Sequence, residues 1–147
     1  MKGILKWPLI LAAVVVVVRV VVERAGAPVS VSSLLSVAAL HTLLVPLYFA
    51  IRIGTNGVQR PYWTLIKLVG IYVVLTRAMI IPTYWLARIY GWTEPRFGGL
   101  AGSDPFTGFI GIPFATAAMW IGASLVFGGL IGSIVIFALR SRMAPAQ

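Results

Sequence analysis

The sequence predicts an all-helical, multi-pass membrane protein with four transmembrane helices in a single domain. Of its 147 residues, 60% are hydrophobic and 10% are charged, and the mean hydropathy is +0.99. These values are typical of integral membrane proteins and not of soluble domains. Four apolar segments are each long enough to cross about 30 Å of hydrocarbon, which takes about 20 helical residues. The predicted spans cover residues 4–22, 33–53, 62–90 and 112–139 of the domain 1–147.

Composition also excludes several classes of function. The chain has no cysteine, so it has no disulfide, no thiolate nucleophile and no metal site with a cysteine ligand. Its formal net charge is +9, but the Lys and Arg residues stand at the ends of the apolar segments and do not cluster on one polar face. We therefore expect no nucleic acid among its partners.

The first span, residues 4–22, is dominated by valine, which lipid accepts in a helix because an open strand leaves its backbone groups without partners. Arg19 and Glu23 are four residues apart, so they lie on one helix face and we expect an interfacial ion pair. A secretory signal peptide is the alternative for this segment, because residues 25–27 resemble a small-residue cleavage site. The charges just before that site argue against cleavage, and we expect a retained membrane anchor.

The remaining spans are punctuated by proline. The second span, residues 33–53, contains Pro46, which should bend it. The third span, residues 62–90, follows Pro61 at a favourable first helical position and is about 40 Å long, so it must tilt, kink or project beyond the bilayer. The fourth span, residues 112–139, ends in a basic pair.

The basic residues also predict an orientation, because Lys and Arg near span ends favour the cytoplasmic side. Both termini are expected inside, in the bacterial inner membrane. The cytoplasmic set is Lys2, Lys6, Arg52, Arg60, Lys67, Arg140 and Arg142. The smaller outer set is Arg19, Arg24, Arg88 and Arg96.

The connection between the third and fourth spans differs from a flexible linker. Residues 91–111 combine six glycines with aromatic residues, among them Trp92, Phe97 and Phe106. Aromatic side chains gain stability when they are buried or lie at a membrane interface. We expect an ordered outer loop in which these three residues contact another protein; the alternative is a loop that rests on lipid head groups.

Small residues recur every four positions in the fourth span, at Ser124, Gly128 and Gly132. This spacing forms a groove in which a second helix can approach closely. Either a helix of the same chain or a second chain can fill it. The stripe resembles the last helix of small multidrug-resistance transporters, but those proteins depend on a membrane-embedded Glu in their first helix, where this chain has mostly valine.

Two polar side chains inside the spans are candidate binding residues. His41, the single histidine, is the type of residue that ligates haem iron or chlorophyll magnesium; its alternative is an ordinary buried histidine with a hydrogen-bonded neighbour. Arg77 lies on one helix face with Tyr84, and no acidic residue is expected at its depth. We expect its partner to be a lipid phosphate, a cofactor carboxylate, a quinone oxygen or another subunit's acid; outward snorkelling to an acid of its own chain is the alternative.

No combination of residues in the sequence matches a catalytic site, so we expect no enzyme and no required cofactor. The function we expect is that of a non-catalytic accessory subunit in a larger membrane complex, of the electron-transfer or photosynthetic kind, in contact with other subunits and with lipid. The first alternative is a small electron-transfer protein that binds haem, pigment or quinone through His41 and Arg77. The second alternative is a homo-oligomeric transporter.

Overall fold

The computed structural model describes residues 3–34 and 36–143, and within them it is helical with no strand. The α-helices are α1 (Lys6–Arg24), α2 (Val29–Leu34), α3 (Val37–Ala39), α4 (Val45–Thr55), α5 (Pro61–Ile89) and α6 (Ile112–Met143). Two π-helical turns, η1 (Leu40–Leu44) and η3 (Thr107–Gly111), precede α4 and α6, and η2 (Pro95–Phe97) is a 3-10 turn. An all-helical fold is therefore confirmed for the described residues.

Three helical segments are long and apolar enough to cross a membrane: Val37–Thr55, Pro61–Ile89 and Thr107–Arg142. They correspond to the second, third and fourth predicted spans. The first predicted span forms α1, which has 19 residues but carries Lys6, Arg19, Glu23 and Arg24 within them. Charge, and not length, separates this helix from the other three, and a fourth crossing stays a prediction.

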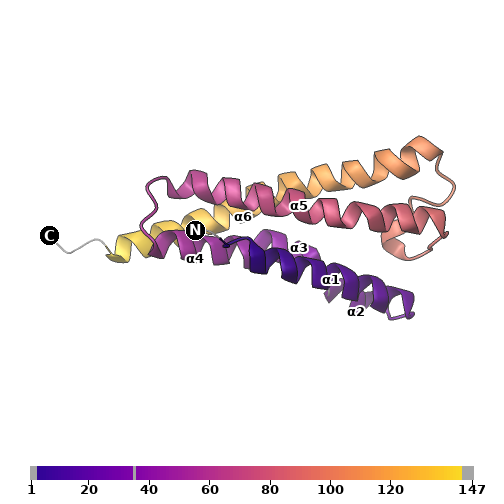
Figure 1. The fold of residues 1–147 in the computed structure, drawn as a ribbon, viewed down its shortest axis with the longest axis horizontal. Helices are drawn as coiled ribbons and strands as arrows, with labels where there is room; N and C mark the ends of the chain where they lie inside the picture. The colour runs from indigo at the N-terminus through magenta and orange to yellow at the C-terminus, as the bar shows by residue number, and fades with distance from the viewer. Residues whose placement is uncertain (1–2, 35, 144–147) are drawn as a thin grey trace.

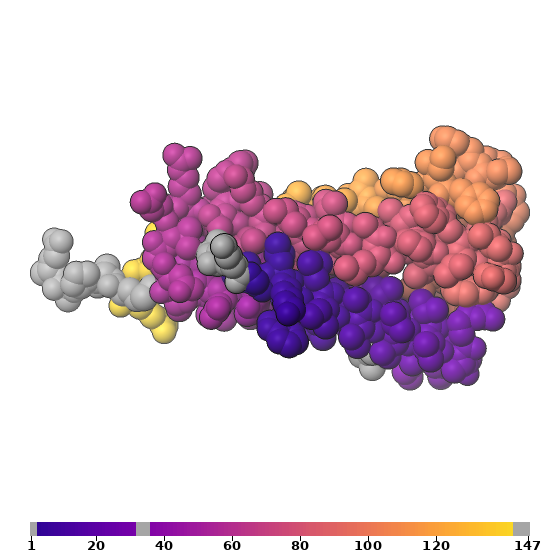
Figure 2. All heavy atoms as spheres, viewed as in Figure 1, coloured from indigo at the N-terminus to yellow at the C-terminus, as the bar shows by residue number. Residues whose placement is uncertain are grey.

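The elements run back and forth along a narrow bundle (Figure 1). α6 packs against both α4 and α5, and α1 packs mainly against α5. In the space-filling view, α1 and α2 cover only part of the length of α5 (Figure 2). We call the end that carries residues 90–111 the outer end and the end with the α4–α5 connection the inner end, following the predicted orientation.

The second predicted span is not one regular helix. Ser36 caps α3 with its side-chain oxygen, which accepts a hydrogen bond from the Ala38 N–H at 3.2 Å. The chain then widens into the π turn η1, where the Val45 N–H bonds to the Leu40 carbonyl. Pro46 follows directly and offers no N–H, so the wider turn lies where a proline disturbs the regular hydrogen-bond ladder. α5, in contrast, continues without a break through Pro82.

The small-residue stripe of α6 is filled by helices of the same chain. A Cβ atom at Gly128 would lie 2.7 Å from Cγ of Pro46, and one at Gly132 would lie 2.6 Å from a methyl carbon of Leu65. Ser124 is fully buried. Of the two alternatives for this groove, the structure therefore shows the intramolecular one, in which small residues allow the close approach of neighbouring helices.

Candidate anion-binding cavity

Arg77 is buried, with 7% of its surface exposed. Its polar partner is the other candidate residue inside the spans, His41. The Nη2 of Arg77 lies 3.0 Å from Nδ1 of His41. Because a guanidinium only donates, Nδ1 must be the unprotonated nitrogen of the imidazole. The guanidinium carbon also lies 5.2 Å from the ring centre of Trp120, a cation–π contact. Its Nε atom is buried and makes no hydrogen bond.

The contact with Trp120 indicates how deep Arg77 lies. Twenty residues separate Trp120 from Arg140, whose guanidinium bonds to the Val58 carbonyl at the inner end. At about 1.5 Å per residue this separation is about 30 Å, which equals the thickness of the hydrocarbon. If the hydrocarbon begins at Arg140, Arg77 therefore lies close to its outer boundary and not at its centre.

Arg77 shares a cavity of about 240 Å³ with two other arginines, Arg19 of α1 and Arg96 of the outer loop. The other residues that line it are Val16, Ser36, Val37, Ala38, Ile80, Tyr84 and Trp120. Tyr84, the third predicted binding residue, thus reaches the same cavity as Arg77. His41 is not among the residues that line the cavity, although its Nδ1 contacts the guanidinium of Arg77.

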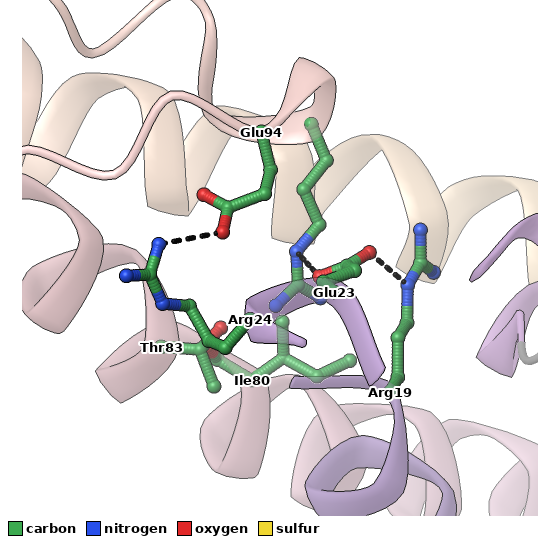
Figure 3. Close-up of polar contacts among 7 residues, drawn as sticks. Arg19, Glu23, Arg24, Ile80, Thr83 and Glu94 are labelled. Atoms are coloured by element: carbon green, nitrogen blue, oxygen red, sulfur yellow. Dashed lines mark hydrogen bonds and ion pairs between the residues drawn. The ribbon is translucent and has the colours of Figure 1, made fainter. Parts of the chain in front are cut away.

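One carboxylate serves two of these arginines. The Nε of Arg19 donates to Glu23 at 2.8 Å, which confirms the pair expected from their four-residue spacing, and Figure 3 shows this contact. The Nε of Arg96 lies 2.9 Å from the other oxygen of Glu23 but makes no hydrogen bond to it, so this is a charge contact. Burial lowers the pKa of Arg96 below its ordinary value, although the charge of Glu23 acts in the opposite direction.

A second ion pair lies beside the cavity and not in its lining. The Nη1 of Arg24 donates to Glu94 at 2.8 Å, and Arg24 remains half-exposed (Figure 3). Burial alone would raise the pKa of Glu94, but hydrogen bonds from its own backbone and from Arg24, with the nearby positive charges, hold it below its ordinary value. Glu94 is therefore an ionised partner of Arg24 and does not neutralise Arg77.

The charges of the cavity do not balance. Of the three guanidinium groups, those of Arg19 and Arg96 contact the carboxylate of Glu23, and Glu94 adds a longer-range attraction to Arg96. Among the described residues no carboxylate lies within ion-pair distance of Arg77. Three guanidinium nitrogens, Nε of Arg77 and both Nε and Nη2 of Arg96, are buried without a hydrogen-bond acceptor, although Nε of Arg96 keeps its charge contact with Glu23. Such unpaired buried donors are costly, so the cavity is suited to a small group that carries negative charge and several acceptor oxygens.

The outer loop is packed against the helices of its own chain. Phe97 is 1% exposed, and its ring meets Tyr84 edge-on at 5.2 Å and lies 5.8 Å from Trp92. Phe106, in contrast, is 68% exposed. Of the three aromatic residues predicted to contact a partner, Phe97 is thus buried within the chain, Trp92 is partly buried beside it, and Phe106 is free to meet another surface.

Arg88 holds the loop to α5, a role that the sequence alone did not reveal. Its guanidinium donates to the carbonyl oxygens of Leu100 and Ser103 and to the Ser103 hydroxyl. From the sequence, Arg88 was expected only as one of the basic residues on the outer side of the membrane. A single planar group that satisfies three acceptors fixes the loop more firmly than the loop's many glycines suggest.

We expect Arg88→Lys to raise the rate of proteolytic cleavage within residues 91–111 by about tenfold. A single ammonium group cannot make all three hydrogen bonds that the planar guanidinium of Arg88 donates to the loop. Limited proteolysis in detergent measures this rate. Arg24→Lys is the matched control, because both contacts of Arg24, with the Glu94 carboxylate and with the Trp92 ring, can be made by a lysine. Equal cleavage rates in the two variants would show that Arg88 does not anchor the loop.

His41 is enclosed on all sides. It has no exposed surface, its ring meets Tyr72 edge-on at 5.5 Å, and its Nε2 atom is buried without a hydrogen-bond partner. With Nδ1 directed at Arg77, only Nε2 remains for a metal, and it faces protein in this conformation. The role of His41 as a haem or chlorophyll ligand stays a prediction, whereas its contact with Arg77 gives it a structural partner.

No protein-family model matches this chain, and comparisons with curated proteins and with solved structures give no match either.

Proposed function

We propose that this protein is a non-catalytic accessory subunit of a larger membrane complex. The observation that carries the proposal is a set of exposed apolar side chains spread along residues 106–137, at the outer end of the chain and along α6, which we call the apolar stripe. Each member is between 48% and 68% exposed. The members are Phe106, Ile110, Phe114, Met119, Val126, Phe127, Leu130, Ile134 and Phe137.

The apolar stripe is longer than the hydrocarbon is thick. Phe106 and Phe137 are 31 residues apart, which corresponds to about 45 Å of helix against about 30 Å of hydrocarbon. A tilt of roughly 50° would be needed to submerge it, and transmembrane helices tilt by about 0–40°. Part of this set, from Phe106 to Phe114, therefore extends beyond the lipid chains, where exposed apolar side chains are stabilised best by another protein.

We further propose that the chain crosses the bacterial inner membrane four times, with both termini in the cytoplasm. The ribbon supports this arrangement, because α1 begins and α6 ends toward the inner end of the bundle (Figure 1). The larger number of Lys and Arg residues expected at that end supports the same orientation. The charges of α1 are compatible with a crossing, since all but Lys6 lie in its last turn and a half.

A photo-crosslinking residue at Ile110 tests the proposed subunit role in native membranes. Ile110 lies ten residues beyond Trp120, about 15 Å outside the hydrocarbon boundary estimated above. We expect a single protein adduct of discrete mass. The matched position is Ile134, which belongs to the same stripe but lies within the hydrocarbon, where lipid adducts are expected.

The mass of the adduct separates the hypotheses. An adduct with a different polypeptide supports an accessory subunit, whereas an adduct of twice the mass of this chain supports the homo-oligomeric alternative. If Ile110 yields lipid adducts alone, as expected for Ile134, the accessory role loses the observation on which it depends.

A further inference from the structure

We propose that the cavity lined by Arg19, Arg77 and Arg96 binds the phosphate group of an anionic membrane lipid. This inference does not depend on the accessory role, because it concerns a site formed within one chain. It assigns a ligand class to the cavity and a binding role to two further arginines: Arg19, which was expected only as an outer charge in an ion pair with Glu23, and Arg96, which was expected only as an outer charge.

The cavity lacks the negative charge that its arginines require. Glu23 compensates Arg19 and Arg96 in part, and the neighbour of Arg77 is a neutral imidazole. Removal of a guanidinium from water without a counter-charge is costly, and only 7% of the surface of Arg77 is exposed. A phosphate group supplies both the missing charge and enough oxygens for the unpaired N–H groups of Arg77 and Arg96.

The position and the size of the cavity favour a lipid head group over the other anions considered. Arg77 lies near the estimated outer boundary of the hydrocarbon, next to the layer in which lipid phosphates reside. The lining of the cavity contains both arginines and apolar residues such as Val16 and Ile80, so it can contact the charged and the apolar parts of a lipid. The volume of about 240 Å³ is below the range of about 300–1,000 Å³ typical for drug-sized ligands, so it fits a head group and not a haem.

Native mass spectrometry of the delipidated protein tests the site. The probes are dioleoyl phosphatidylglycerol, zwitterionic dioleoyl phosphatidylcholine and inorganic phosphate, each titrated separately. We expect one phosphatidylglycerol per chain, bound at least about tenfold more tightly than phosphatidylcholine, as expected for charge-assisted hydrogen bonds. Millimolar inorganic phosphate should not displace it, because a free ion lacks the apolar part of the ligand.

Two variants and one control locate the lipid. Arg77→Gln should weaken phosphatidylglycerol binding by about tenfold or more through the loss of a charged donor. Ala38→Phe should weaken it similarly by filling the cavity while all charges remain, which covers the case in which Arg77→Gln fails to fold. Arg24→Gln removes the same charge from the same outer layer but does not line the cavity, and it should bind phosphatidylglycerol like the unmodified chain.

Four results would overturn the proposal. Equal binding of the two lipids would show that the protein does not select the negative charge of the head group. Equal losses in Arg77→Gln and Arg24→Gln would show that general surface charge attracts the lipid. Displacement by inorganic phosphate would assign the cavity to a free anion. A photo-crosslinker at Ala38 that captures a protein in native membranes, and not a lipid, would assign the cavity to an acidic side chain of a partner.

Discussion

Glu23→Gln is expected to lower the free energy of unfolding by about 3–5 kcal/mol, the cost of removing one partner from a buried ion pair. The Glu23 side chain is 7% exposed and contacts both Arg19 and Arg96. Its neutralisation leaves three arginines around one cavity with no carboxylate among them. Unfolding in mixed micelles, followed by circular dichroism, measures this loss.

Glu94→Gln is the matched control for Glu23→Gln. It makes the same chemical change in the same outer layer, but its partner Arg24 is half-exposed, so we expect a loss below about 1 kcal/mol. The double variant Glu23→Gln/Arg19→Gln should recover part of the stability, because it removes one of the repelling charges. Equal losses for the two single variants would contradict the central position that we assign to Glu23.

The anionic-lipid proposal adds a condition to this prediction. Phosphatidylglycerol should restore part of the stability that Glu23→Gln loses, because its phosphate replaces the missing negative charge beside Arg77. If Glu23→Gln destabilises the fold but phosphatidylglycerol restores no stability, the result supports the structural role of Glu23 and contradicts the proposed lipid site. The two inferences can therefore fail separately.

Gly128→Leu is expected to cost at least about 3 kcal/mol, the upper end of the usual range for overpacked cores. A Cβ atom there would lie 2.7 Å from the ring of Pro46 and 3.3 Å from the carbonyl oxygen of His41. Neither a proline ring nor a backbone oxygen can rotate away, so α6 must move off α4. A lower midpoint of thermal unfolding in detergent measures the effect.

Gly122→Leu provides the control on the same helix. No atom lies within 4 Å of a Cβ at this exposed position, and we expect a change within about 0.5 kcal/mol. The oligomeric state distinguishes a groove filled by a helix of the same chain from one filled by a helix of a second chain. If Gly128→Leu dissociates an oligomer while each chain stays as stable as before, the groove serves an interface between chains and not the contact with Pro46.

Much of the fold could be predicted from local pattern. The third span was expected at residues 62–90 and forms Pro61–Ile89, because an apolar run after a proline determines where a helix begins. The pair of Arg19 and Glu23 followed from their four-residue spacing alone. The second span was predicted less well, since a π turn before a proline depends on how neighbouring helices pack and not on hydropathy.

The candidate site shows where local pattern ends. The sequence by itself determined that this chain is helical, apolar in long segments and short of acidic residues, because composition and periodicity act within one turn of helix. Only the tertiary structure decided that His41 contacts Arg77, that Arg96 of the outer loop contacts Glu23 of α1, and that α4 and α5 fill the small-residue groove. These contacts join residues far apart along the chain, and their geometry depends on how whole helices pack together, which no local spacing specifies.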